Sequence, residues 1–335
     1  MSHKPHNHQR HCSPDSLPCK RPLTLAAVCS SALWCFCALF LLLLCLPNAC
    51  LSAERTTVIY PDVPEPYKNI FNTILEGIST DSHSEIKHFL LPDNYQLEDI
   101  QQALEANRSD GIITLGKRGY LAAKELGTEI PVVSGALSMI PNGISGISLS
   151  ADPEVLFSRL KTLAPNSRRI FVVYSEKNTG WLIPLAKAAA EKLGYLLIAY
   201  PAGDLRSAVR HYRTILDEAR GPKDTIWLPL DRVTTHDDVV LPLLLQKAWD
   251  NDLIIISNKP SHAKRGALFA MYPDNFGLGQ ELTLLLDQLT NGTEDSKVIP
   301  LKRLNLAVNL RTASHLGLNF TPQQQEDFKV TFPAR

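Results

Sequence analysis

The amino-acid sequence predicts an α/β fold with two doubly wound lobes. From residue 54 onward, short apolar runs alternate with longer amphipathic stretches, which predicts βα units with parallel sheets and right-handed crossovers. A Gly/Ser-rich segment at 142–150 interrupts this alternation, which then starts again. All seven cysteines lie at or before Cys50, so the remaining residues need no disulfide to fold. About 280 residues are enough for two domains, each with its own core.

The first series of elements predicts the first lobe. Its expected strands are 57–60, 86–91, 111–116 and 131–133, and its expected helices are 67–78, 97–105 and 120–126. The first helix is predicted because Ile70, Ile74 and Ile78 recur at helical spacing. The third strand is a short apolar run between two glycines, which is typical of a strand buried on both faces.

The second series begins at Asp152-Pro153, an expected N-cap followed by proline in the first helical position. Its expected helices are 154–163, 182–193, 204–219 and 235–249, and its expected strands are 169–175, 196–200, 225–230 and 253–257. Thr235 with Asp238 three residues later predicts a capping-box start for the fourth helix.

The C-terminal part has too few elements for a third core. A strand is expected at 266–272, a helix at 276–289, an extended segment at 298–309 and a short helix at 312–316. We expect this part to cross between the lobes, so that three segments form a hinge: 138–152, 258–275 and 292–305. The expected organisation is a leader at 1–53, lobe 1 at 54–140 plus about 270–292, and lobe 2 at 141–269 plus about 293–335. A protein of two hinged lobes can close around a ligand.

The leader predicts export. Residues 23–46 carry no charge and are long enough to cross a hydrocarbon core of roughly 30 Å. The four basic residues before them are Lys4, Arg10, Lys20 and Arg21. A basic flank keeps the N-terminus in the cytoplasm and sends the rest across the membrane, so the expected location is the periplasm or the outer face of the cytoplasmic membrane. Three interpretations stay open: a cleaved signal peptide, a lipoprotein signal with Cys50 as the lipidated residue, and a retained anchor.

Composition and motifs argue against several classes of function. The formal net charge is +0, which gives no nucleic-acid footprint. The sequence has no G-x-S-x-G elbow, Walker loop or H-E-x-x-H motif, so no enzyme is expected. His236-Asp237-Asp238 is expected in the first turn of a helix, where acids complement the dipole. The histidine-rich start at 3–11 matches no closed zinc site, and neither a metal nor a cofactor is expected.

Several motifs together resemble a known family. They are Gly266-Ala-Leu-Phe-Ala-Met-Tyr-Pro-Asp274, Leu278-Gly-Gln-Glu281, Leu289-Thr-Asn-Gly292, Ile299-Pro300 and Asn309-Leu-Arg-Thr-Ala-Ser-His-Leu-Gly-Leu318. In this order they resemble the C-terminal half of the ABC-transporter substrate-binding family whose better-known members bind aromatic amino acids. In the first half, 110–116, 130–133 and 144–148 look like the family's strands and crossing. The resemblance covers about residues 56–330.

The resemblance implies two Rossmann-like lobes in a periplasmic binding protein-like fold of type I. It also implies a small, amino-acid-like solute and an ABC permease and ATPase as partners. Two loops depart from the family's pattern. Ser134–Pro141 stands where an Asp-Pro-Val turn is usual, and the segment Pro61–Pro66 is short and rich in proline. The resemblance therefore supports the fold and the binding role more than the ligand's identity.

Candidate ligand-binding residues follow from position. In open α/β sheets, ligands meet the carboxyl ends of the strands. The residues expected there are Tyr60, Asp62, Gly116, Ser134, Gly135, Ser175, Asn178, Thr179, Asp231, Asn258, Lys259 and Tyr272. Residues of these types at strand ends are also ordinary turn and cap residues.

We expect different contacts from different members of this set. The two glycines would let the backbone approach a ligand, and the two tyrosines would stack on its apolar part. Asp231 would bind an ammonium group, and Ser175 and Thr179 would donate hydrogen bonds.

The expected function is that of an extracytoplasmic solute-binding protein that delivers its solute to an ABC importer. The alternative is a membrane-tethered sensor subunit that presents its ligand-bound state to a membrane partner protein. An enzyme on the same fold is a third class, and it would lack any recognisable pair of nucleophile and base.

Overall fold

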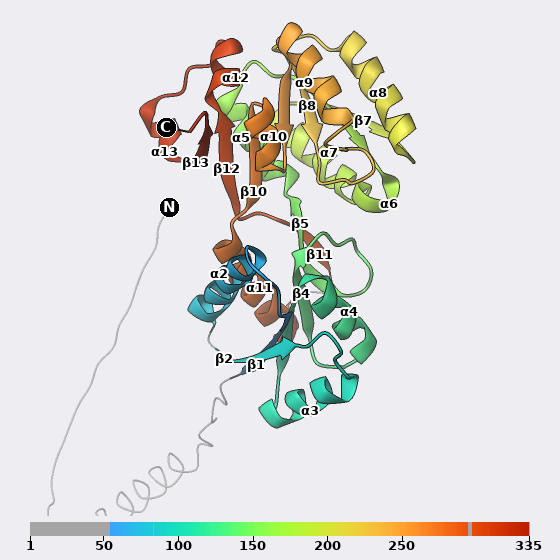
Figure 1. Ribbon diagram of the computed structural model, residues 1–335, viewed down its shortest axis with the longest axis vertical. Coiled ribbons are helices and arrows are strands. Elements are labelled where there is room, and N and C mark those ends of the chain that lie inside the picture. The colour runs from blue at the N-terminus through green and yellow to red at the C-terminus, as the bar shows by residue number, and fades with distance from the viewer. Residues whose placement is uncertain (1–53, 83, 294–296, 335) are drawn as a thin grey trace, which may run out of the picture. The chain divides into compact units, whose positions relative to one another are not determined.

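The structure is a computed structural model that describes residues 54–82, 84–293 and 297–334. The described residues belong to one compact unit, and Figure 1 labels most of its helices and strands. The predicted leader, with Cys50 and the histidine-rich start, lies outside the described residues. Within the described residues, no helix is both long enough and apolar enough to span a membrane.

The first sheet has six parallel strands in the order β11-β5-β4-β3-β1-β2. Its strands are β1 (Arg55–Pro61), β2 (Glu85–Leu91), β3 (Gly111–Leu115), β4 (Val132–Leu137), β5 (Ser145–Ala151) and β11 (Val298–Leu301). Its helices are α2 (Tyr67–Asp81), α3 (Leu97–Asn107), α4 (Gly116–Leu126) and α11 (Asn275–Thr290). Neighbouring residues of β1 point to opposite faces, so Val58 packs with α2 and α11 while Ile59 packs with α3 and α4.

The second sheet has seven strands in the order β13-β12-β10-β9-β8-β6-β7. They are β6 (Arg169–Tyr174), β7 (Leu196–Pro201), β8 (Asp224–Leu228), β9 (Ile254–Ser257), β10 (Phe269–Pro273), β12 (Leu304–Asn309) and β13 (Phe328–Phe332). Its helices are α5 (Pro153–Leu163), α6 (Glu176–Thr179), α7 (Leu182–Leu193), α8 (Leu205–Glu218), α9 (Val240–Asp250), α10 (Pro260–Arg265), α12 (Leu310–His315) and α13 (Pro322–Glu326). All neighbouring strands are parallel except β10 and β12. The predicted fold of two doubly wound α/β lobes is therefore present.

The chain passes between the two sheets three times, at β5 to α5, at β10 to α11 and at β11 to β12. The sequence places the first change of lobe at 141, whereas in the structure it falls at Asp152. The reason is that β5 continues the first sheet by pairing with β4. Backbone pairing also assigns two later strands. β10 pairs with β9 and β12 and so belongs to the second sheet, whereas β11 pairs with β5 and so belongs to the first.

Local signals explain where some helices begin. Asp152 caps α5 as predicted, because its carboxylate accepts hydrogen bonds from the backbone N–H groups of Glu154 and Val155. The predicted capping box of Thr235 and Asp238 is wrong. Helix α9 begins only at Val240, and the residues before it form turns. Four further elements, α6, α10, α13 and β13, were not predicted from the sequence, because they are too short to show a clear hydrophobic period.

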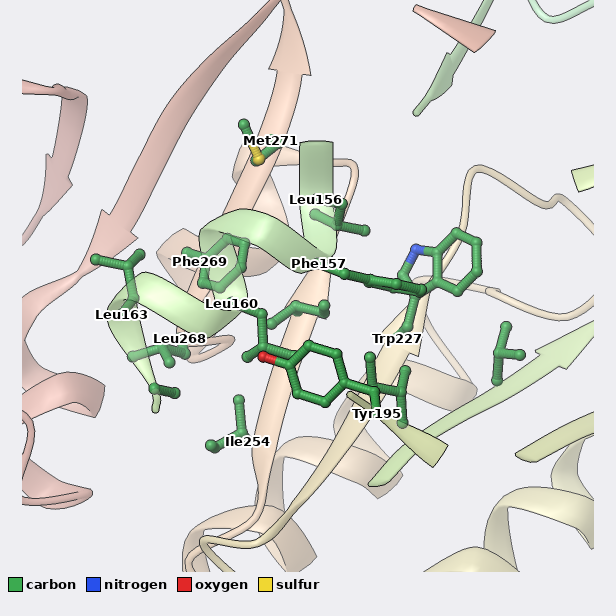
Figure 2. Packing of buried hydrophobic residues seen from close by; sticks show 14 of the residues in the cluster. Leu156, Phe157, Leu160, Leu163, Tyr195, Trp227, Ile254, Leu268, Phe269 and Met271 are labelled. Carbon is green, nitrogen blue, oxygen red and sulfur yellow. The ribbon is translucent and has the colours of Figure 1, made fainter. Parts of the chain in front are cut away.

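The core of the second sheet packs aromatic rings against each other (Figure 2). Phe157 of α5 and Trp227 of β8 are 0% and 1% exposed. Their ring centroids are 5.4 Å apart and their planes cross at 90°, the edge-to-face geometry that aromatic pairs favour. This contact fixes α5 on one face of the sheet, while α8 and α9 cover the other.

In the first sheet, α2 and α11 lie in close contact across two glycines. A Cβ atom on Gly77 would lie 2.0 Å from the carbonyl oxygen of Phe276, and one on Gly279 would lie 2.2 Å from that of Ile74. Only glycine allows this approach of two backbones. The contact holds α11, which enters from the second sheet, in the first core.

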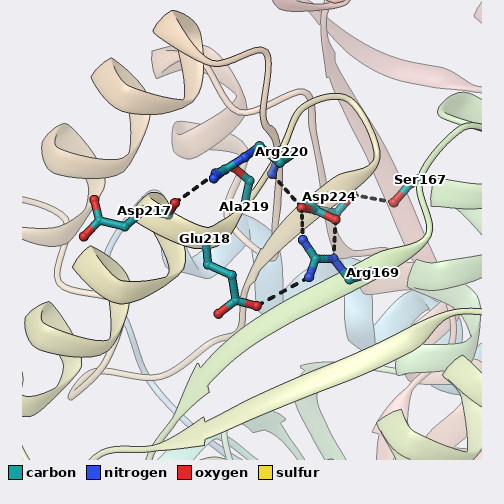
Figure 3. Close-up of polar contacts among 8 residues, drawn as sticks. Ser167, Arg169, Asp217, Glu218, Ala219, Arg220 and Asp224 are labelled. Atoms are coloured by element: carbon teal, nitrogen blue, oxygen red, sulfur yellow. Dashed lines mark hydrogen bonds and ion pairs between the residues drawn. The ribbon is translucent and has the colours of Figure 1, made fainter.

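A buried ion pair joins the amino ends of β6 and β8 (Figure 3). Arg169 donates to both oxygens of Asp224, from Nε at 2.8 Å and from its terminal nitrogen at 2.6 Å. The backbone N–H of Arg220 also donates to Asp224, at 2.6 Å. The Asp224 side chain is 2% exposed, so these three donors replace the water that it loses on folding.

Candidate ligand-binding site

Each sheet has a switch point, where the connections leave in opposite directions. In the first sheet it lies between β1 and β3, and in the second between β6 and β8. Ligands of doubly wound sheets bind beside the carboxyl ends of the strands at such points. Tyr60 and Asp62 come at the end of β1, and Gly116 follows β3. The residues predicted from the sequence in this lobe therefore lie at the carboxyl edge of the first sheet.

The second sheet has the same arrangement. Ser175 follows β6, Asp231 follows β8, and Asn258 with Lys259 follows β9, which is the next strand along. Because these strands are parallel, their carboxyl ends lie at one edge. The structure brings Ser175, Thr179 and Asp231 into direct contact.

The carboxylate of Asp231 faces inward. Its Oδ2 accepts hydrogen bonds from the backbone N–H of Ser175 at 2.9 Å and from Oγ1 of Thr179 at 2.6 Å. Its Oδ1 accepts from the backbone N–H groups of Val233 and Thr234, at 2.8 and 3.2 Å. The residue is 2% exposed, and four donors use the capacity of both oxygens. This geometry gives Asp231 a structural role and leaves it no free oxygen for a ligand ammonium.

A hollow of about 450 Å³ lies beside this corner, at the carboxyl ends of β6, β7 and β8. Its lining is made of Ser175, Glu176, Lys177, Asn178, Pro201, Ala202, Gly203 and Val233. Glu176 and Lys177 are exposed, so the hollow offers one charge of each sign. Sequence reasoning included Asn178 but missed its two charged neighbours. Their position directly after a buried strand is the signal that could have found them.

Glu176 is held by a neighbouring tyrosine. The Tyr174 hydroxyl donates to Oε1 of Glu176 at 2.7 Å. Burial, together with this hydrogen bond and the charge of Glu176, raises the pKa of Tyr174 to about 12. The phenol therefore stays protonated at physiological pH and remains a donor, which orients the carboxylate at the rim of the hollow.

In the first sheet, the small residues serve packing. The Ser134 hydroxyl lies 2.7 Å from that of Thr114, and both residues are 0% exposed. A Cβ atom on Gly135 would lie 2.7 Å from the Leu282 side chain, so the space beside this glycine belongs to α11. Gly116 has a φ of +73°, which favours glycine in the sharp turn from β3 into α4.

Tyr60, Tyr272 and Asn258 are each in part surrounded by neighbouring residues. Burial raises the pKa of Tyr60, with a smaller contribution from the charge of Asp62. Burial and the charge of Asp274 do the same for Tyr272. Asn258 is 7% exposed and lies 3.4 Å from the indole nitrogen of Trp227. Asp62 is the most exposed of the predicted residues in the first lobe.

The predicted helical position of the segment after β8 is wrong. His236-Asp237-Asp238 was expected in the first turn of a helix, but it lies in the turns before α9. Asp237 instead accepts hydrogen bonds through Oδ1 from Lys259 Nζ at 2.7 Å and from His262 Nε2 at 3.1 Å. The predicted ligand residue Lys259 therefore has an internal acidic partner.

His262 also contacts Ser257, whose Oγ lies 2.7 Å from Nδ1. Hydrogen bonds join Ser257 to His262 and His262 to Asp237, as in the catalytic triad of a hydrolase. However, Ser257 and His262 are both 0% exposed. No substrate can reach a hydroxyl that has no surface. The chain of hydrogen bonds thus joins α10 to the loop after β8. Among the described residues, no group of three His, Cys, Asp or Glu side chains could hold a metal ion.

No model of a known protein family matches the sequence, and no curated protein matches it either. Solved structures do. The ligand-free, open structure of a substrate-binding protein with adhesive properties from Clostridium difficile is 16% identical, with a TM-score of 0.55, and the match covers 84% of this chain and 100% of that one. The ABC domain in complex with L-Trp from Streptococcus pneumonia is 16% identical, with a TM-score of 0.49, and covers 84% of this chain and 100% of that one.

The match to the Clostridium difficile protein identifies the fold. The chain has the periplasmic binding protein-like fold that the sequence motifs predicted, with two doubly wound lobes and three crossings between them. The predicted resemblance to substrate-binding proteins is thereby confirmed at the level of the fold. At 16% identity, the likeness carries neither the ligand nor the binding residues.

Proposed function

We propose that this chain is an extracytoplasmic solute-binding protein that captures a small, amino-acid-like solute and delivers it to an ABC importer. The observation that carries the proposal is the pair of switch points, one in each of two sheets between which the chain passes three times. Polar residues gather at both carboxyl edges, and three crossings provide a hinge. The fold is that of binding proteins, which supports binding rather than catalysis.

The amino-acid-like class rests on the sequence motifs and on the hollow after β6. Glu176 and Lys177 are exposed there, and Asn178 adds an amide. A zwitterion carries an ammonium and a carboxylate, which match one charge each. Among the predicted residues we retain Tyr60, Asp62, Asn178, Lys259 and Tyr272 as ligand contacts.

The buried members of the predicted set support the site from behind in this proposal. Asp231, Thr179 and Ser175 hold the corner beside the hollow, and Ser134 with the two glycines fixes the first edge. Asn258, with 7% exposure, belongs to the same supporting group.

Location and partners follow from the leader and the family resemblance. We propose export across the cytoplasmic membrane and contact with an ABC permease and its ATPase. N-terminal sequencing of the exported protein distinguishes a cleaved or lipidated carrier, with a start near Glu54 or at Cys50, from a chain retained in the membrane.

Thermal-shift screening of amino acids, small peptides and sugars tests the proposed binding. A ligand at 100 times its Kd stabilises the folded protein by about 2.7 kcal/mol, which is easily measured. We expect at least one amino-acid-like compound to raise the Tm, and Asn178→Ala to weaken its binding. Lys187→Ala, on the exposed side of α7, is the matched control and should bind normally. A well-folded protein that no compound stabilises would overturn the proposal.

A further inference from the structure

A second cavity lies far from the candidate site. It has a volume of about 810 Å³ and is lined by the end of α9, the residue before β9, the end of α10, and parts of α12 and β13. Leu253 lines it, whereas Asn258 belongs to the opposite, carboxyl end of β9. The four residues of β9 lie between Leu253 and Asn258, and five steps along an extended strand span roughly 17 Å. This distal cavity is therefore a feature of its own, of a size typical of small-molecule sites.

An ordered aromatic wall forms one side of the distal cavity. The rings of Trp249 and His315 stack at a centroid distance of 3.7 Å and an angle of 8°. His315 Nε2 donates to the carbonyl oxygen of Trp249 at 2.9 Å and lies 3.1 Å from a carboxylate oxygen of Asp252. These contacts fix the imidazole against the indole. Trp249 is nevertheless 40% exposed, so part of its ring is available to a ligand.

Positive charge surrounds this wall. The guanidinium of Arg311 lies 5.6 Å from the centre of the Trp249 ring, and Lys264 and Arg265 also line the cavity. Arg265 donates to a backbone carbonyl, that of Asp237, so this contact leaves its charge uncompensated. Among the described residues, Lys264 and Arg311 make no ion pair, and no Asp or Glu lines the cavity. Three cations line the cavity, whereas the Asp252 carboxylate beside His315 is not among its lining residues, so the lining favours an anion at this place.

Most of the remaining lining is apolar, although Gln246, Asn309 and Thr312 also contribute. Leu245, Leu316 and Phe332 contribute from α9, from the end of α12 and from β13. An inorganic anion would leave this apolar surface exposed to water, and a neutral apolar molecule would leave the cations without a counter-charge. We propose that the distal cavity is a second binding site, which takes a small amphipathic anion: a carboxylate or sulfonate on an aromatic or aliphatic body. The anionic group lies against Arg311 and Lys264, and the apolar body lies along Trp249.

Calorimetric titration of the full-length chain with 3-phenylpropionate tests the site. The protein is kept in a non-ionic detergent, with the detergent alone as the blank. We expect saturable binding of one molecule per chain. Arg311→Gln should weaken it about tenfold, because a charge-assisted contact of about 1.4 kcal/mol is lost. Trp249→Leu should weaken it about fivefold, through loss of aromatic contact. Both positions are exposed, so the variants should fold.

Two controls separate this site from the candidate site in the hollow after β6. Arg213→Gln removes an exposed charge from α8, and Asn178→Ala alters that hollow; both should bind 3-phenylpropionate as the unchanged protein does. The neutral amide of the same acid should bind at least about tenfold more weakly. The proposal is overturned if no binding appears with a Kd below about 1 mM, if the amide binds equally well, or if Asn178→Ala abolishes binding while Arg311→Gln does not.

Discussion

Thr179 donates a hydrogen bond of 2.6 Å from its hydroxyl to the carboxylate of Asp231, and both residues are 2% exposed. Thr179 ends the short helix after β6, and Asp231 follows β8, so this bond closes the switch point of the second sheet. The two residues look like ligand contacts in the sequence. In the structure they contact each other, and they hold the wall beside the hollow in place.

Asp231→Asn should destabilise the folded protein by about 2 kcal/mol. The new amide nitrogen would face donors, such as the N–H of Ser175, that now have an acceptor. Chemical denaturation in the absence of any ligand measures this loss. Asp238→Asn, at an exposed site in the same loop, is the control and should change stability by less than about 0.5 kcal/mol. If Asp231→Asn instead left stability unchanged and abolished only ligand binding, the carboxylate would be a ligand contact.

Asp224→Ala should reduce stability by about 3 kcal/mol, because it leaves the N–H of Arg220 without its acceptor and the half-buried Arg169 with only its longer contact to Glu218. Arg169→Ala should leave the 2% exposed carboxylate with fewer donors and should also destabilise. Urea denaturation of both single variants and the double variant gives the coupling energy. A double variant whose loss equals the sum of the two single losses would show that the pair is not coupled.

The fold was largely predictable because both lobes consist of regular βα units. Strands such as β3 and β8 are short runs buried at every position, and period and turn residues mark them clearly. The change of lobe at Asp152 was harder to predict, because β5 joins the first sheet without a helix before it. Its membership depends on backbone pairing with β4, which leaves no trace in its own sequence.

The site was predictable as an edge of the sheets, but not in its contacts. Strand ends follow from the sequence, so the positions of Ser175 after β6 and Asp231 after β8 were predictable. Whether a side chain turns toward a ligand or toward its neighbours depends on where other strand ends lie. Asp231 and Ser175 are 56 positions apart, and only the parallel pairing of β6 with β8 brings them together.

Phe157→Ala should destabilise the second lobe by about 3–5 kcal/mol, since it leaves a cavity beside Trp227 in a fully buried place. Phe157→Leu keeps most of the volume and should lose less, about 1–2 kcal/mol. Thermal unfolding followed by tryptophan fluorescence measures both. Equal losses in the two variants would show that the volume of the side chain does not set the stability here.

Stability should fall on mild acidification because of His262. Burial lowers its pKa from 6.5, outweighing the opposite effect of Asp237, and the charges of Lys259 and Arg265 lower it further. The unfolded chain therefore binds a proton at a higher pH than the folded protein does. The contribution of neutral His262 is complete above about pH 6.5 and is lost as the pH falls through the lowered pKa. Denaturation at several pH values should show this slope, and His262→Asn should flatten it. An unchanged slope in the variant would assign the effect to other groups.

Glu281 should act in the opposite sense at the crossing from β11 to β12. Its Oε1 accepts from the backbone N–H of Arg303 at 3.1 Å, while its buried Oε2 has no hydrogen-bond partner among the described residues. Burial raises the pKa of Glu281 above 4.5, and this effect outweighs the lowering of the pKa by the backbone N–H groups of Lys302 and Arg303. The folded protein therefore holds this proton to a higher pH than the unfolded chain does, and the penalty of the charged form grows as the pH rises through the raised pKa.

Glu281→Gln removes that charge and keeps an acceptor for Arg303, so it should stabilise the protein at pH 7. The gain should disappear below about pH 4.5, where the carboxyl is protonated in both states. Denaturation midpoints at pH 7 and pH 4 measure the difference, with the exposed Glu191→Gln as the matched control. Glu281 contacts Arg303 at the crossing from β11 to β12, so the same variant also tests the hinge. If the charge opposes closure of the lobes, Glu281→Gln should lower the Kd of the ligand at pH 7 but not at pH 4. A variant that is less stable than the unchanged protein at pH 7 would mean that the carboxylate makes a favourable contact there.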